Sequence, residues 1–343
     1  MKIFRITLLS LISILFIGCE KEWYYNNGQD NKISLFLTAY ADSIIIGTGW
    51  PVVDVLNPNI NSNIDDADGT IVSQSTGYFS INSGGPIQFE KIYERNNPLW
   101  GNFMYNYPFK GGDTINVNVK CNNYIPVVSS TIMPDKPSIY AECIGYEVDP
   151  EVTGTSDSLM IIKVGIKDNK AKNNYYILHA GSHREAIFSI KFNKLPEYLL
   201  QYITQGRDTM YESKMCYNYF HSDESLFSNS KVTVLNEKSC LSEPLFDDNL
   251  LDAKGEFIIK CRKCPSKLPE ITDSLQIMHI KERLLTNQKH YVLIRLDELS
   301  EEYYKYLKYT ENPDMYNLPP SNVEGGYGVF GAVNRSATIR LNF

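Results

Sequence analysis

The sequence lacks the short motifs by which many enzymes and metal sites are recognised. It has no Gly-x-Ser-x-Gly elbow, Walker loop, dinucleotide fingerprint or zincin helix. Its five histidines are scattered along the chain, at His179, His183, His221, His279 and His290. His179 and His183 stand four residues apart, but Gly181 separates them and the segment is patterned as a strand followed by a turn, so helical metal-ligand spacing is not met. The sequence therefore predicts no enzyme, no cofactor and no metal site.

The chain also has fewer positively than negatively charged side chains. Lys and Arg total 33 against 40 Asp and Glu, which gives a formal net charge of −7. Phosphate binding needs clustered Lys and Arg, so this balance argues against a nucleic-acid partner. Only one long apolar run is present, at the N-terminus. A helix that crosses a bilayer needs about 20 apolar residues, so a second membrane attachment is not predicted.

The first 19 residues have the pattern of an exported lipoprotein. Two basic residues precede the apolar run Ile6–Ile17, which is short for a membrane span and typical of a secretory signal. The run ends in Gly18-Cys19, where the sequence resembles a bacterial lipobox. We predict a signal peptide over residues 1–18 and a lipid on Cys19. The alternative is an ordinary cleaved signal peptide.

Residues 19–31 are polar and rich in turn-forming residues, which predicts a tether between the lipid and the fold. Glu20 and Glu22, just after the lipidated cysteine, resemble the surface-export signal of Bacteroidota lipoproteins. Acyl chains contribute about 0.8 kcal/mol per buried methylene, so several chains hold a protein durably at a membrane. We therefore expect a protein anchored by lipid to the outer membrane and exposed at the cell surface.

The rest of the chain is patterned as an all-β protein. Short apolar runs with alternating polarity are ended by Gly, Pro, Asn and Asp, and 24 tyrosines suit half-buried strands. Two prolines in Met133–Pro137 resist both helix and sheet, so we place a boundary there. The prediction is two β-sandwich-like domains, an N-terminal one over 32–133 and a C-terminal β-rich one over 134–343.

The second domain is expected to carry one or two short helices. Leu195–Tyr202 has helical spacing, with Pro196 in the first turn. Ser300 supplies a hydroxyl cap for a helix to about Tyr309, with acidic residues in its first turn. Leu275–Ile280 and His290–Leu296 are predicted as strands joined by a turn near residues 286–289.

Two segments suggest a ligand site. Asp65, Asp66 and Asp68 precede Gly69, but EF-hand spacing fails, so a turn at Asp68-Gly69 is favoured over calcium. The stretch 96–112 is the most aromatic in the chain, with Phe103, Tyr105, Tyr107 and Phe109 at a period of two that places them on one strand face, and with Trp100 before them. This face is either part of the core or a solvent-exposed platform for a sugar or peptide. Its candidate ligand-binding residues are Trp100, Phe103, Tyr105 and Tyr107.

Six cysteines remain once Cys19 is assigned to the lipid: Cys121, Cys143, Cys216, Cys240, Cys261 and Cys264. An even number in an exported protein favours disulfides, although six cysteines allow 15 pairings. Cys261 and Cys264 form a single Cys-x-x-Cys, which lacks the second pair of a zinc ribbon and a thioredoxin context. Structural bridging is the preferred interpretation, and proximity in sequence suggests Cys216 with Cys240 and Cys121 with Cys143.

The run Asn322–Ala332, Asn-Val-Glu-Gly-Gly-Tyr-Gly-Val-Phe-Gly-Ala, together with the segment Leu299–Tyr306 before it, resembles the domain-of-unknown-function 4249 family. These are Bacteroidota outer-membrane lipoproteins, often encoded near TonB-dependent receptors. Further matching points are Gly77-Tyr78-Phe79, Gly112-Asp113-Thr114, Pro134–Pro137 and Asn174-Tyr175-Tyr176. The resemblance implies an all-β architecture with an N-terminal transthyretin-like or immunoglobulin-like sandwich. It brings no catalytic residues.

Four functions are consistent with these observations. The leading hypothesis is a non-enzymatic, lipid-anchored outer-membrane accessory of a TonB-dependent nutrient-uptake system, which would bind a ligand or receptor subunit through loops. The alternatives are a stand-alone surface glycan- or peptide-binding protein, a hydrolase with a dispersed site, and an adhesin or fimbria-like subunit.

Overall fold

The computed structural model describes residues 32–41, 44–51, 75–91, 103–121, 124–148, 158–167, 172–192, 209–227, 232–235, 238–251, 255–264, 280–313 and 319–343. Several features predicted above lie outside these residues. They are the signal peptide and tether with Cys19, the turn at Asp68-Gly69, Trp100 and the helix Leu195–Tyr202.

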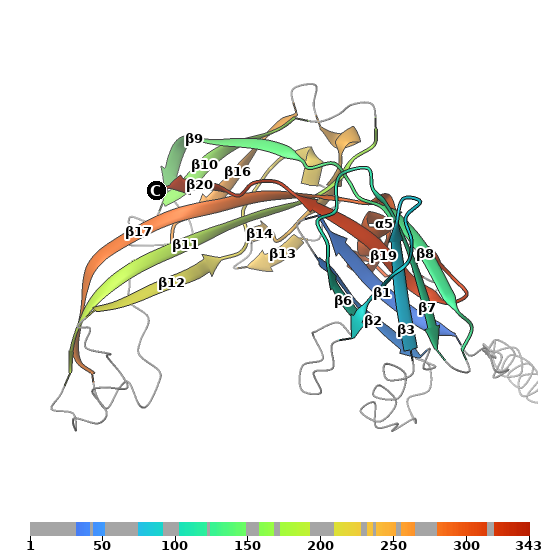
Figure 1. Cartoon of the computed structure of the whole chain (residues 1–343). Coiled ribbons are helices and arrows are strands. Elements are labelled where there is room, and N and C mark those ends of the chain that lie inside the picture. Colours follow the sequence, from blue (N-terminus) through green and yellow to red (C-terminus); the bar gives the residue numbers. More distant parts are fainter. Residues whose placement is uncertain are drawn as a thin grey trace, which may run out of the picture.

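The chain forms two β-sandwiches that share one ten-stranded sheet (Figure 1). In the first sandwich, this sheet contributes β1 (Ile33–Tyr40), β2 (Ile44–Pro51), β5 (Glu90–Lys91), β6 (Phe103–Asn106) and β19 (Tyr327–Arg335). A five-stranded sheet faces them, in the order β18 (Val323–Glu324), β8 (Val127–Ile132), β7 (Thr114–Cys121), β3 (Ser75–Ile81) and β4 (Ile87–Gln88). The predicted all-β, sandwich-like fold is confirmed.

In the second sandwich, the shared sheet contributes β11 (Tyr175–Phe192), β12 (Thr209–Tyr217), β17 (Ile280–Leu299), β15 (Leu245–Asp247) and β20 (Ile339–Asn342). The facing sheet has the order β16 (Glu256–Arg262), β10 (Ser158–Lys167) and β9 (Ser138–Val148). The remaining described elements are the hairpin β13 (Val232–Leu235) and β14 (Lys238–Leu241), the 3₁₀ turns η1 (Ser225–Phe227) and η2 (Asp248–Leu250), and the helix α5 (Glu301–Glu311).

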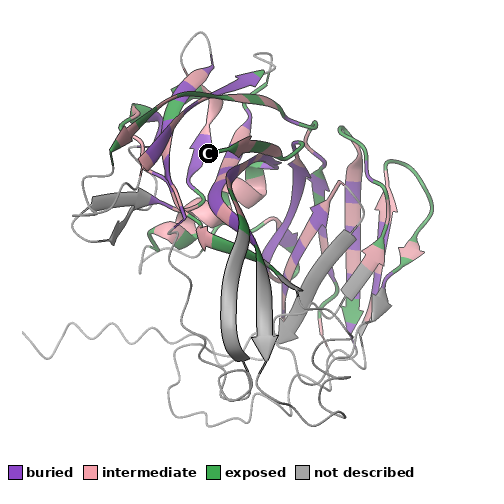
Figure 2. Cartoon of the chain, turned by 90° about the vertical axis from the view of Figure 1, so that its left-hand side faces the viewer, coloured by how far each residue is buried: buried purple, intermediate pink, exposed green. Residues whose placement is uncertain are grey.

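Each sandwich has its own core because the strands alternate apolar and polar residues. Along β1, buried and half-buried residues alternate without a break, and most of β7 follows the same pattern, so every second side chain reaches the core (Figure 2). The first core contains Leu35, Phe79 and Val117, and the second contains Ile162, Tyr176 and Ile294.

The first core is completed by residues from the end of the chain. β19 pairs in parallel with β1, and Phe330 and Ala332 of β19 and Val323 of β18 belong to the first core. The linker Met133–Pro137 does connect β8 of one sandwich to β9 of the other. A division of the chain at residue 133 nevertheless fails to separate the two cores, since β18 and β19 return to the first one.

The two sandwiches meet at a narrow joint. There Asp297–Leu299 of β17 pair with Val333–Arg335 of β19. Helix α5 packs over these strands, with the Tyr304 ring stacked on Tyr175 at a centroid distance of 4.6 Å. A small cluster of Leu245, Leu299 and Val333 lies beneath the helix. Three backbone pairs and one helix thus contribute to the joint in the described part of the chain.

Helix α5 confirms the helix predicted from Ser300 to about Tyr309, but Ser300 acts differently from the prediction. Its hydroxyl makes no capping bond within the helix. It accepts a hydrogen bond from the backbone N–H of Ala332, at 3.1 Å. Ser300 therefore ties the start of the helix to β19.

Two turns predicted from the sequence are wrong. Residues 286–289 lie inside β17, and Gly181 lies inside β11, because these two strands pair with each other from Tyr175–Leu299 to Phe192–Ile280. Because the pairing is long, both segments have backbone partners on the neighbouring strand, and neither forms a turn. The resulting ribbon β12-β11-β17 curves away from the core (Figure 1).

Glycines in β19 allow the close approach that the first core needs. Gly328 has a φ of +111°, and a Cβ there would lie 2.1 Å from the carbonyl oxygen of Leu35. We expect Gly328→Ala to lower the free energy of unfolding by at least about 2 kcal/mol, through the strained φ and the clash with β1. Urea unfolding of the purified variant measures this loss.

Gly85→Ala is the matched control, because a Cβ there meets no atom within 4 Å. It should leave stability unchanged or raise it slightly, since alanine restricts the unfolded chain. Equal unfolding midpoints for Gly328→Ala and Gly85→Ala would show that the close packing of β19 on β1 is not required.

Candidate functional site

The aromatic stretch suggested as a platform packs against the first core where its side chains are described. The rings of Tyr105 and Tyr107 lie 5.0 and 6.4 Å from the ring of Phe79, and Phe109 is buried. Tyr105 and Tyr107 are half-buried against the same cluster. The side chain of Phe103, like all of Trp100, lies outside the described part. For Tyr105 and Tyr107, the contacts favour the core interpretation.

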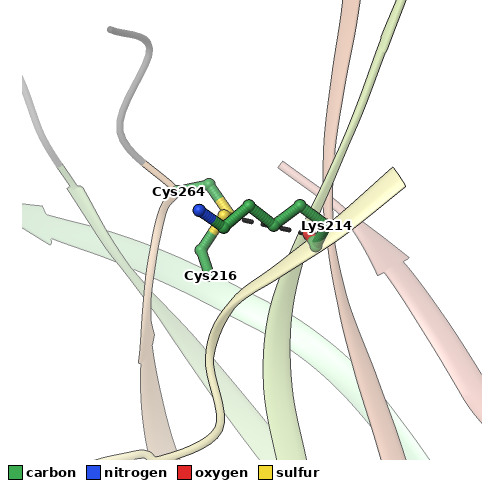
Figure 3. Close-up of a disulfide and its surroundings, with 3 residues drawn as sticks. All are labelled: Lys214, Cys216 and Cys264. Carbon is green, nitrogen blue, oxygen red and sulfur yellow. Dashed lines mark hydrogen bonds between the residues drawn. A yellow bond between two sulfur atoms is a disulfide. The ribbon is translucent and has the colours of Figure 1, made fainter. Parts of the chain in front are cut away.

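One disulfide joins Cys216 of β12 to Cys264, just after β16 (Figure 3). The pairings suggested by proximity in sequence are wrong, because Cys216 bonds to Cys264 and both Cys121 and Cys143 are thiols. No local pattern predicts a bridge across 48 residues, since it forms only when β12 comes next to the end of β16. The side chain of Cys240 is outside the described residues.

Cys261, the other cysteine of the Cys-x-x-Cys pair, is not part of the disulfide. Cys261 is a fully buried thiol in the second core, and burial raises its pKa to about 12. Such a thiol is neither a good nucleophile nor a good metal ligand. Within the described residues, no group of three or more His, Cys, Asp or Glu side chains is placed to hold a metal ion.

A cleft of about 640 Å³ opens where β20 ends against β17. Among the described residues, its lining is Glu185, Lys263, Gln288, Lys289, His290, Arg340, Asn342 and Phe343. The disulfide ties Cys264, which follows Lys263 in the chain, to β12. We call this cleft the β17–β20 cleft.

Arg340 is fixed in the β17–β20 cleft by two neighbours. Its guanidinium donates to both carboxylate oxygens of Glu185, at 3.1 and 3.3 Å, and lies 3.6 Å from the ring centre of Tyr291. The hydrogen bonds from Arg340 hold the pKa of Glu185 below its ordinary value. Glu185 is thus committed to Arg340 as an ion-pair partner.

The β17–β20 cleft has unused capacity for an anionic partner. Among the described lining residues, Lys263 and Lys289 add two positive side chains to that of Arg340, against one carboxylate side chain, that of Glu185. The side-chain amide nitrogen of Gln288 is buried and has no hydrogen-bond partner. A buried donor without an acceptor is costly, so an acceptor oxygen placed in the cleft would relieve it.

A second polar cluster lies at the joint, centred on the buried carboxylate of Asp297. Arg295 donates to its two oxygens at 2.7 and 3.0 Å, and Arg335 lies 3.7 Å away. The two ring nitrogens of His179 lie 3.1 Å from Asp297 and 3.1 Å from Glu243. We call these five residues the Asp297 cluster. Because it joins β11, β17 and β19, it links the two sandwiches electrostatically.

Within the Asp297 cluster, the pKa of the histidine is raised and the pKa values of the two carboxyl groups are lowered. Burial disfavours the imidazolium of His179, but hydrogen bonds to Asp297 and Glu243 outweigh it and raise the pKa of His179 above 6.5. Burial also disfavours the Asp297 carboxylate, yet His179 and Arg295 bring its pKa below 3.8. The pKa of Glu243 is lowered from 4.5, chiefly by its hydrogen bond with His179.

These shifts predict a pH window for the contribution of the cluster to stability. The His179 contribution is fully present below pH 6.5 and is lost as the pH rises through the raised pKa. The Asp297 and Glu243 contributions are present above pH 3.8 and 4.5 and are lost as the pH falls through the lowered values. We expect His179→Gln to reduce the free energy of unfolding more at about pH 5.5 than at about pH 8.5, as measured by urea unfolding.

His183→Gln is the matched control. Burial and nearby Arg340 lower the pKa of His183, so its pH trend should run the other way. If His179→Gln costs the same at both pH values, the imidazolium of His179 does not stabilise the joint.

The fold described here can be compared with known proteins. The sequence model of a family described as "Domain of unknown function (DUF4249)" matches residues 43–339. The chain belongs to the DUF4249 family. The match runs from just before β2 to the start of β20, so it covers most of both sandwiches and leaves out β1. A search of curated proteins finds no match. No helix within the described part of this DUF4249 protein is both long and apolar enough to cross a membrane.

Proposed function

We propose that this DUF4249 protein is a lipid-anchored, non-enzymatic accessory protein of the outer membrane that works with a TonB-dependent nutrient-uptake receptor. The observation that carries the proposal is the β17–β20 cleft. In a chain of net charge −7, three cationic side chains and a buried amide donor converge on one cleft. Such a cleft suits an acidic segment of a partner protein.

The anchoring half of the proposal is supported by the sequence around Cys19. The pattern of basic start, apolar run and Gly18-Cys19 is that of a lipoprotein signal, and residues 19–31 provide a polar tether. A lipid anchor confines the protein to the plane of the membrane. Confinement raises the effective concentration of any membrane partner, so a modest interface is sufficient for stable association.

The non-enzymatic half is supported by how the charged groups are used. Arg340 is paired with Glu185, and Asp297 is shared between His179 and Arg295. General acid–base chemistry needs a group within reach of a substrate whose pKa lies near the working pH. Hydrogen bonds from cationic side chains instead lower the pKa values of Glu185 and Asp297, which suits ion-pair partners better than acid–base catalysts.

Purification of the protein from membranes in mild detergent tests the proposal. The expected result is an acylated Cys19 in the N-terminal peptide, by mass spectrometry, and a TonB-dependent receptor that co-purifies with the chain. Lys263→Glu combined with Lys289→Glu should lower the recovered receptor at least about tenfold, because it reverses the charge of the cleft.

Lys136→Glu is the matched control, since Lys136 is exposed in the linker between the sandwiches, outside the cleft lining. It should leave recovery of the receptor unchanged. Absence of a TonB-dependent receptor from the wild-type preparation would overturn the accessory role. An unmodified Cys19 would overturn the anchor.

A stand-alone surface glycan-binding protein is the second candidate function. The observation that favours it is a polar groove of about 390 Å³ on the five-stranded sheet of the first sandwich. A protein that captures glycans at the surface would not require a receptor for binding, so it would bind saccharides equally well after purification to homogeneity.

A further inference from the structure

The groove on the first sandwich lies on the outer face of the five-stranded sheet. Phe79 and Val117 point into the first core, so their neighbours Tyr78, Asn116 and Asn118 point outward. The groove extends from Tyr78 and Pro86 at one side to Asn322 and Glu324 at the other. It therefore crosses four strands: β3, β7, β8 and β18.

Strand pairing arranges the outward side chains of the groove in two rows. Ser80, Asn116 and Ser130 are paired across β3, β7 and β8. Tyr78, Asn118, Val128 and Glu324 form the second row, which continues onto β18. The first row thus presents hydroxyl and amide groups at the spacing of adjacent strands, about 4.8 Å. The second row presents a phenol, an amide, the apolar Val128 and the carboxylate of Glu324.

The edge of the groove is fixed by Asn322. Its amide nitrogen donates to the carbonyl oxygens of Ser130 and Phe330, at 3.0 and 2.8 Å, and its amide oxygen accepts from the N–H of Phe330. The hydroxyl of Ser129 donates to the Asn322 carbonyl at 2.7 Å. The side-chain amide of Asn322 is thus hydrogen-bonded to both β8 and β19, and this wall of the groove is held in place without a ligand.

Asn118 is different, because its side-chain oxygen is buried and has no hydrogen-bond partner. Asn is also unfavourable within strands, and Asn116 and Asn118 both occupy β7, which has a strand on each side. A buried acceptor without a donor costs stability. A ligand hydroxyl that donates to Asn118 would remove this cost.

We propose that this groove binds a neutral oligosaccharide. Among the described residues that line it there is no lysine, arginine or histidine, which disfavours an anionic ligand, and Glu324 is the only charged one. Sugar hydroxyls both donate and accept, as the row of amide and hydroxyl groups requires, and the ring of Tyr78 offers an apolar surface for the carbon face of a sugar. The proposal is independent of the β17–β20 cleft, which belongs to the other sandwich.

The test is a calorimetric titration of the detergent-solubilised full chain with cellohexaose, xylohexaose and maltohexaose. At least one of these should bind. Asn118→Val should weaken that binding at least tenfold. The same substitution should leave the urea midpoint unchanged or raise it, because valine suits a strand and removes the unpaired oxygen. If Asn118 served only to stabilise the fold, Asn118→Val would lower the urea midpoint.

Lys120→Val is the matched control, on the same strand and face but outside the groove lining. It should bind the saccharide as the wild type does. Binding of none of the three saccharides would overturn the proposal, as would wild-type affinity in Asn118→Val. Equal competition by hexaglycine would also overturn it, because it would assign the groove to an extended peptide.

Discussion

The structure depends on the parallel pairing of β1 with β19. Seven residue pairs, from Ser34–Tyr327 to Tyr40–Val333, join segments from opposite ends of the sequence. This pairing completes the first core and makes the two sandwiches share a sheet. Such a non-local contact forms only after a loop of nearly the whole chain has closed, so its interactions must offset the entropy of closing that loop.

The same pairing sets the position of both candidate binding sites. β19 is followed directly by β20, which places Arg340 over Tyr291 and beside Glu185 in the β17–β20 cleft. β18 precedes β19 and brings Asn322 to the wall of the polar groove. Both sites are therefore built partly from the last strands, while the Asp297 cluster connects β17 to β19 where the sandwiches meet.

Sequence reasoning recovered what local patterns determine. Alternating polarity predicts the all-β fold and the strand at His290–Leu296, which lies within β17. A capping residue and an acidic first turn predict helix α5 after Ser300. Sequence reasoning fails where pairing overrides local preference, as in β17, whose polar middle has the sequence pattern of a turn but lies within a strand. Neither the bridge from Cys216 to Cys264 nor the position of Arg340 has a local signal, because both follow from which strands become neighbours.

The claim that the end of the chain completes the first sandwich can be tested directly. Residues 32–133 are expressed alone, and their unfolding in urea is followed with and without a peptide that spans residues 319–336. Our account predicts no cooperative transition for residues 32–133 alone, and a cooperative transition once the peptide supplies β18 and β19. Cooperative unfolding of residues 32–133 without the peptide would contradict it.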